Sequence, residues 1–175
     1  MLITWKPYEL HPKGLDFDLT FMPVSADDYI REIWKRIEKI ANENKIPIEF
    51  PSALSKSRLA LESSEYARID LQKYKTFLDL MYKAYFLQKQ DIEKMDIILK
   101  VAKNSELNVE ELEQELKSGL YTQIIQESKR EAMAYGINGV PAFIVGTKKK
   151  MYIPGCQPIP TFKELFEKVD KENSS

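Results

Sequence analysis

The chain has 175 residues, of which 43% are hydrophobic and 30% are charged, a composition that suits one globular domain with a sizeable core. Its 26 Lys and Arg residues against 27 Asp and Glu residues leave a formal charge of −1, which gives no electrostatic case for binding nucleic acid or an anionic membrane. One cysteine, Cys156, excludes an intramolecular disulfide, and one histidine, His11, excludes a His-rich zinc site. We therefore expect no metal, nucleic-acid or membrane partner.

The first residues carry no basic region followed by a long apolar run, so they do not resemble a signal peptide, and we expect a cytoplasmic protein. β-Branched and aromatic residues predict a short strand at about Leu2–Trp5. Pro7 and Pro12 predict that this strand ends in a loop. The stretch from His11 to Val24 contains two prolines and a glycine and is expected to be irregular.

The middle of the chain is predicted to be helical. Ser25, with an acidic residue three positions later, has the pattern of a helix cap, and apolar residues follow it at helical spacing over Asp27–Asn44. Five further helices are predicted, at Lys56–Leu71, Lys73–Gln88, Ile92–Asn104, Val109–Ser118 and Tyr121–Tyr135. An aromatic stripe on the second of these is interpreted as a core face rather than a cofactor site; its members are Tyr74, Phe77, Leu78, Met81, Tyr85 and Phe86.

The last 40 residues have a different pattern. An apolar strand is predicted within Gly139–Gly146, a charged turn at Thr147–Lys150 and a second strand at Met151–Pro154, which together predict a β-hairpin. Thr161 is expected to cap a final helix.

The most informative segment is Tyr135–Val145 (Tyr-Gly-Ile-Asn-Gly-Val-Pro-Ala-Phe-Ile-Val), followed by Ile153–Pro158 (Ile-Pro-Gly-Cys-Gln-Pro). It resembles the C-terminal half of the DsbA-like thioredoxin superfamily, in the cytoplasmic branch that includes the 2-hydroxychromene-2-carboxylate isomerases. Trp5–Pro12 is similar to that family's second strand, and Ser57–Ala60 resembles the start of its inserted helical subdomain. Four matches in the family's order make this resemblance fairly specific.

The resemblance implies an α/β thioredoxin-like fold with a helical insertion. The thioredoxin-like parts would be residues 1–24 and 137–175, and the insertion would be residues 25–136. It also implies that Pro141 follows a cis peptide bond, and that Val140 pairs with an extended peptide or with glutathione as an added strand. Most X–Pro bonds in folded proteins are trans, which favours the alternative of a trans proline that begins a strand. The surrounding motif favours the cis form instead.

In the family, a reactive Cys-X-X-Cys pair, or a lone serine in the isomerases, lies at the N-terminus of a helix upstream of the strand that Trp5–Pro12 resembles. Met1 stands where that strand begins, so we expect the first strand and its reactive helix to be absent from this chain. The preferred interpretation is a DsbA-like thiol–disulfide oxidoreductase family member that is inactive alone. The alternatives are a glutathione-dependent isomerase or transferase and a non-catalytic module that binds peptides or thiols. We expect no resident cofactor, and glutathione is the alternative that the isomerase branch would use.

Three other candidates have plain structural interpretations. Cys156 stands where the family usually has alanine; it could meet a thiol or glutathione, but an idle small residue is the favoured interpretation. His11 is assigned no role. Lys148, Lys149 and Lys150 could bind a phosphate, although the solvated tip of a hairpin is favoured.

An absent first strand has a structural consequence. Leu2–Trp5 and Ala142–Val145 would each leave a row of backbone groups unpaired, which is costly for apolar strands. We expect the gap to be filled, either by a second copy of the chain in a homodimer or by Leu2–Trp5 moving into the vacant position.

Overall fold

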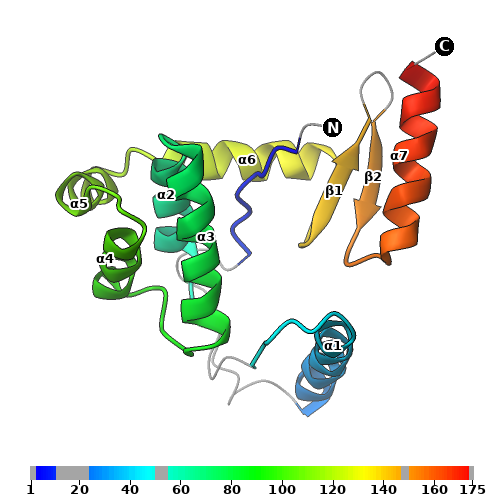
Figure 1. The fold of residues 1–175 in the computed structure, drawn as a ribbon, viewed down its shortest axis with the longest axis horizontal. Helices are drawn as coiled ribbons and strands as arrows, with labels where there is room; N and C mark the ends of the chain where they lie inside the picture. The colour runs from blue at the N-terminus through cyan, green and yellow to red at the C-terminus, as the bar shows by residue number, and fades with distance from the viewer. Residues whose placement is uncertain (1–2, 11–23, 50–54, 147–149, 174–175) are drawn as a thin grey trace. The chain divides into compact units, whose positions relative to one another are not determined.

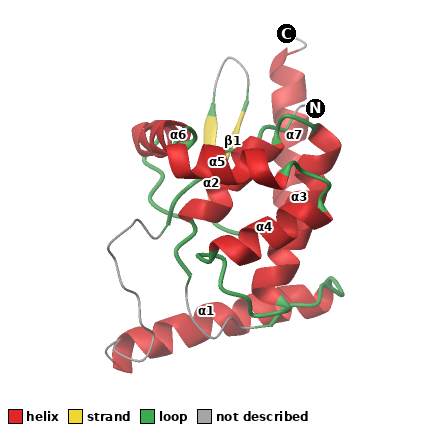
Figure 2. Cartoon of the chain, turned by 90° about the vertical axis from the view of Figure 1, so that its left-hand side faces the viewer, coloured by secondary structure: helices red, strands yellow, loops and turns green. Residues whose placement is uncertain are grey.

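A computed structural model describes residues 3–10, 24–49, 55–146 and 150–173 (Figure 1). The chain forms two compact units: Met1–Leu10 with Gln126–Ser175 make the hairpin unit, and His11–Ile125 make the helical unit. Helix α6 begins in the helical unit and ends in the hairpin unit. In Figure 2 the strands, drawn in yellow, are those of one hairpin within the described residues. None of the described helices is long and apolar enough to cross a membrane.

The helical unit contains the helices that the sequence predicts. Their bounds are α1 Val24–Glu43, α2 Arg58–Ala67, α3 Leu71–Phe86, α4 Met95–Asn104, α5 Val109–Ser118 and the start of α6, Thr122–Ala134. Helix α5 has its expected bounds, whereas α2 ends four residues earlier than expected and α4 begins three residues later.

Short polar side chains explain where two of these helices begin. The Asp70 carboxylate accepts hydrogen bonds from the backbone N–H groups of Lys73 and Gln72, at 3.0 and 2.8 Å, and these bonds hold its pKa below the ordinary value. Asn108 accepts from the N–H of Glu111 at 3.2 Å, at the start of α5. Gly119 ends α5 with a φ of 73°, a conformation that glycine adopts without steric cost.

The core of the helical unit lies between α2, α3, α4 and α5. Phe77 on α3, Ile98 on α4 and Leu112 on α5 have no exposed area. Tyr74 and Met81 of the aromatic stripe are also buried in this core, which confirms that the stripe is a packing face. Because a buried aromatic side chain removes a large apolar area from water, these contacts are a main source of the unit's stability.

The hairpin unit contains β1 (Ala142–Val145), β2 (Met151–Pro154) and α7 (Ile159–Asn173), as Figure 1 shows in orange and red. The two strands pair antiparallel, with Phe143 opposite Ile153, so the predicted hairpin is confirmed. Helix α7 packs against β1, where the rings of Phe143 and Phe162 meet edge to face with centroids 4.8 Å apart.

Two expectations about this unit are wrong. Ile3–Trp5, the described part of the strand predicted at Leu2–Trp5, has no strand conformation. The residues that follow contact α6 instead, through an ion pair of Lys6 with Glu131 and a hydrogen bond from Lys129 to the Glu9 carbonyl. Thr161 does not cap the last helix, which begins two residues earlier at Ile159. Pro160 fits the first turn of α7 because its missing N–H would have no partner inside the helix.

Candidate functional site

The C-terminus of α6 positions the loop that the sequence analysis singles out. The N–H of Ile137 donates to the carbonyl of Ala132 at 3.0 Å, and the N–H of Gly136 donates to Met133 at 2.9 Å. This is the Schellman arrangement, with Gly136 in the left-handed region at a φ of 72° and Ile137 buried. The chain therefore leaves α6 in a fixed direction and reaches Val140 three residues after a buried anchor.

The Val140–Pro141 peptide bond is cis, in agreement with the sequence prediction. The Val140 side chain is 49% exposed, and Pro141 is exposed as well. Among the described residues, none forms a backbone hydrogen bond with Val140. Its N–H and C=O are thus available at the point where the chain enters β1.

A backbone hydrogen bond joins this loop to the turn that follows β2. The N–H of Gly155 donates to the carbonyl of Pro141 at 2.8 Å, and the Gln157 amide donates to the carbonyl of Pro154 at 2.6 Å. Cys156 lies between these two residues and is an exposed free cysteine. The structure therefore brings Val140, Pro141 and the Cys156 turn to one end of the hairpin.

Lys150 is the remaining candidate that the structure describes. His11, Lys148 and Lys149 lie outside the described residues. The ammonium of Lys150 donates to the Tyr135 hydroxyl at 2.8 Å and lies 5.4 Å from the centre of that ring. This hydrogen bond raises the pKa of Lys150. Lys150 thus fastens the base of the hairpin turn to the end of α6.

Comparisons with known proteins show to which family the chain belongs. The family model for the DSBA-like thioredoxin domain matches residues 1–167. The chain belongs to the DSBA-like thioredoxin family. The uncharacterized protein YwbO of Bacillus subtilis (strain 168) is 28% identical over 178 residues, which cover 95% of this chain and 80% of that protein.

A solved structure is similar in fold to this family member. It is a crystal structure described as that of a candidate protein disulfide isomerase from Nitrosomonas europaea, with a TM-score of 0.69. The match covers 86% of this chain and 76% of that one, at 16% identity. Because the identity is low, this likeness establishes the fold alone. With the family match, it confirms the DsbA-like thioredoxin fold expected from the sequence.

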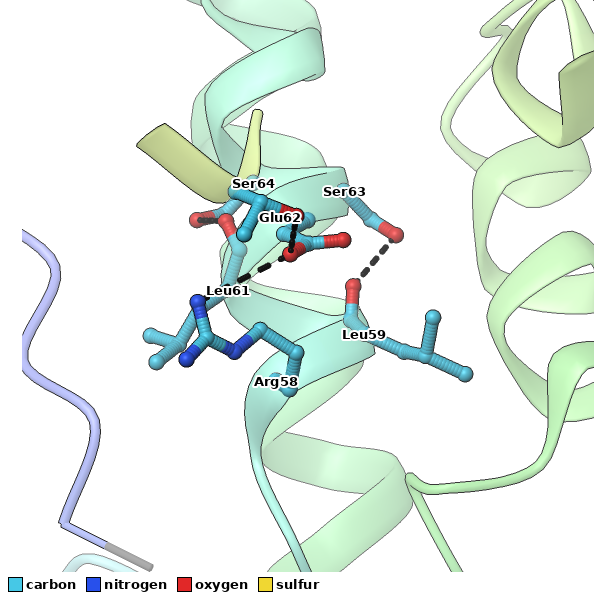
Figure 3. A network of polar contacts seen from close by, with 7 residues as sticks. Arg58, Leu59, Leu61, Glu62, Ser63 and Ser64 are labelled. Atoms are coloured by element: carbon cyan, nitrogen blue, oxygen red, sulfur yellow. Dashed lines mark hydrogen bonds and ion pairs between the residues drawn. The ribbon is translucent and has the colours of Figure 1, made fainter. Parts of the chain in front are cut away.

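A buried polar network lies in the helical unit, where the family-like segment Ser57–Ala60 begins α2. The Glu62 side chain is 5% exposed, forms an ion pair with Arg58 at 3.8 Å, and accepts a 2.8 Å hydrogen bond from the Thr122 hydroxyl. Figure 3 shows the Arg58 guanidinium turned along α2 toward Glu62. Glu62 thereby ties α2 to the first residue of α6, a link that the sequence analysis missed.

Two serines on the same helix, Ser63 and Ser64, are also buried. Ser63 donates to the carbonyl of Leu59 and Ser64 donates to that of Leu61, each at 2.7 Å, as Figure 3 shows for Ser63. These bonds satisfy each hydroxyl within its own helix. Both hydroxyls are therefore engaged as donors inside α2.

Two tyrosines complete this region. The Tyr66 hydroxyl donates to Glu111 at 3.1 Å, and the Tyr121 hydroxyl donates to Glu115 at 2.8 Å. Burial first, and then the neighbouring Glu111, raise the pKa of Tyr66 to about 12. Burial and Glu115 likewise raise the pKa of Tyr121. Because both phenols are held in their neutral form, they act as donors that join helices rather than as bases.

Proposed function

We propose that this family member binds an extended peptide, or glutathione, along the Val140–Pro141 loop and positions its sulfur for thiol–disulfide exchange. The observation that carries the proposal is the state of Val140. Its side chain is half exposed and its backbone N–H and C=O have no hydrogen-bond partner among the described residues. An extended ligand can pair with such groups as an added strand.

The chemistry of the proposal is ordinary exchange. A thiolate attacks one sulfur of a disulfide, a new S–S bond forms, and the other sulfur leaves as a thiolate. A two-cysteine cycle cannot take place within the 175 residues, which contain Cys156 alone. In this proposal the attacking thiol lies outside these 175 residues, and the Val140–Pro141 loop holds the disulfide in place. The single cysteine suits a reducing compartment such as the cytoplasm.

A titration followed by backbone amide NMR tests the binding step. A reduced peptide, a disulfide-containing peptide and glutathione are added separately to the wild-type chain. We expect one of the sulfur ligands to shift the amides of Val140 and Ala142. Val140→Pro removes the pairing N–H and should abolish the shift, whereas Val140→Ala keeps the backbone and should retain it. Equal binding by both variants, or no shift with any ligand, would reject the proposal.

The same titration separates the alternatives. A response to glutathione without a response to either peptide favours a glutathione-dependent isomerase or transferase, for which the exposed Cys156 turn beside the loop is the supporting feature. The chain by itself should not reduce insulin, and Cys156→Ser should leave peptide binding unchanged. Insulin turnover that disappears in Cys156→Ser would instead make Cys156 a one-thiol catalyst working with glutathione.

A further inference from the structure

A lysine of the hairpin contacts the residue that follows α6. Lys150 directly precedes β2, and its ammonium donates to the hydroxyl of Tyr135 at 2.8 Å. The ammonium also lies 5.4 Å from the centre of the Tyr135 ring, which is within the range of a cation–π contact. One side chain of the hairpin therefore holds the end of α6 through two different interactions.

The positive charge of Lys150 suits this position. The last carbonyl groups of a helix carry partial negative charge, so a cation beside the C-terminus of α6 is favourable. Tyr135 first, and then the Glu131 carboxylate one turn earlier on α6, raise the pKa of Lys150. Glu131 also forms an ion pair with Lys6 at 3.0 Å. Both Lys6 and Lys150 are therefore drawn to the C-terminal half of α6.

The loop between α6 and β1 is held at its two ends. At one end, the N–H groups of Gly136 and Ile137 bond to carbonyls of α6, and at the other, the Gly155 N–H bonds to the Pro141 carbonyl. Residues 138–140 lie between these anchors, without helix or strand conformation. The direction of the Val140 backbone groups therefore depends on the angle between the end of α6 and the hairpin.

We propose that Lys150 is a positioning residue for ligand pairing at Val140. By holding Tyr135, Lys150 fixes the angle between the end of α6 and the hairpin, and with it the direction of the Val140 N–H and C=O groups. A ligand that pairs with a loop already in the bound conformation has less ordering to pay for, so its affinity is higher. Lys150 acts through Tyr135 and touches no ligand. The inference rests on the proposed function, since it concerns the same loop.

Three substitutions measure this effect in the titration described above, with the disulfide-containing peptide and with glutathione. Lys150 is exposed, and a cation–π contact at an exposed site changes an equilibrium by about two- to fivefold. Lys150→Met removes the charge and should raise the Kd by about this factor. Tyr135→Phe keeps the ring but removes the hydroxyl, so it should raise the Kd by less. Lys150→Arg keeps the charge and a donor and should retain the wild-type affinity.

A second lysine provides the matched control. Lys168 is also exposed and lies on α7 of the same unit, so Lys168→Met changes the net charge equally and leaves the Tyr135 contact intact. It should retain the wild-type Kd. Equal losses of affinity in both variants would show that net charge is the cause and would overturn the proposal. Thermal unfolding should give the same midpoint for both, and a lower midpoint for Lys150→Met would mean that the contact acts on stability instead.

NMR relaxation of the ligand-free protein provides a readout that does not depend on binding. In Lys150→Met, the amides of Gly139 and Val140 should become more mobile than in the wild type, while those of β1 stay unchanged. Unchanged mobility of these two amides, or a Lys150→Arg variant that behaves like Lys150→Met, would overturn the proposal. If the wild type binds neither ligand, the proposed function fails, and the mobility of the loop still decides whether Lys150 positions it.

Discussion

The helical unit and the hairpin unit bury their apolar side chains to different extents. Phe77, Ile98 and Leu112 have no exposed area, and each comes from a different helix of the helical unit. In the hairpin unit, all four residues of β1 are partly exposed, and Ile153 is the one residue of β2 that is buried. Among the described residues, the helical unit thus encloses its core, whereas the strands of the hairpin unit stay partly exposed.

The reason lies in how each kind of element satisfies its backbone. A helix pairs its N–H and C=O groups within one segment, so a group of helices needs only apolar faces that match. A strand leaves half of these groups for a neighbour, and a two-stranded hairpin is marginally stable without a third strand or a helix to pack against. Helix α7 supplies part of this packing, through the contact of Phe162 with Phe143 on β1.

The largest expected effect is on the closed core. Phe77→Ala should lower the free energy of unfolding by about 3–5 kcal/mol, because it removes a fully buried ring and leaves a cavity. Leu71→Ala, on the same helix but at a side chain that is 66% exposed, should change it by no more than about 0.5 kcal/mol. Urea unfolding followed by circular dichroism measures both. Similar losses for the two variants would show that the helical unit is not closed around Phe77.

A second expected effect concerns alkaline pH. The pKa of Tyr66 is raised from 10.0 to about 12 in the folded protein, so the unfolded chain loses this proton first as the pH rises. The stabilisation from Tyr66 is thus fully present below pH 10 and is lost between about pH 10 and 12. Tyr66→Phe should flatten this part of the stability profile, and Glu111→Gln should weaken it. A profile that Tyr66→Phe leaves unchanged would contradict the assignment.

The next effect concerns the approach to the site. Gly136 has a φ of 72°, and an added Cβ would meet no atom within 4 Å, so the cost of a side chain there comes from the backbone conformation alone. Gly136→Ala should destabilise the protein by about 1–2 kcal/mol, and Gly136→Asn by less, since asparagine tolerates this region better. Thermal unfolding compares the two. Equal losses of stability in the two variants would mean that the left-handed conformation is not the reason for glycine at this position.

Much of the helical unit could be predicted from the sequence because helical spacing of apolar residues is a local signal. One error occurred where a cap was missed. Residues up to Leu71 were assigned to the helix that ends at Ala67, although Asp70 has the side chain that begins α3. The prediction of a strand at Leu2–Trp5 was wrong because strand formation is not a local property. A strand requires a neighbour, and composition does not show whether one is present.

The candidate site was predictable in part. Gly136, Val140 and Pro141 lie in one short motif, in which Gly136 has a positive φ and the Val140–Pro141 bond is cis. The hydrogen bond from Gly155 to Pro141 follows from the hairpin register, which the sequence did not specify residue by residue. The contact between Glu62 and Thr122 joins residues 60 positions apart and left no local pattern that could have revealed it.

The smallest expected effect concerns what holds Ile3–Leu10 in the hairpin unit. Lys6 and Glu131 form an ion pair at 3.0 Å, but their side chains are 60% and 50% exposed. Exposed pairs contribute little because water and salt screen them, so Lys6→Ala should cost no more than about 0.5 kcal/mol. Lys129→Met should cost more, since its ammonium donates to the Glu9 carbonyl at 3.2 Å. A double-mutant cycle of Lys6→Ala with Glu131→Ala, at low and high salt, measures the pair itself. A coupling well above that value would mean that charge, rather than the burial of neighbouring residues such as Glu9, keeps this segment in place.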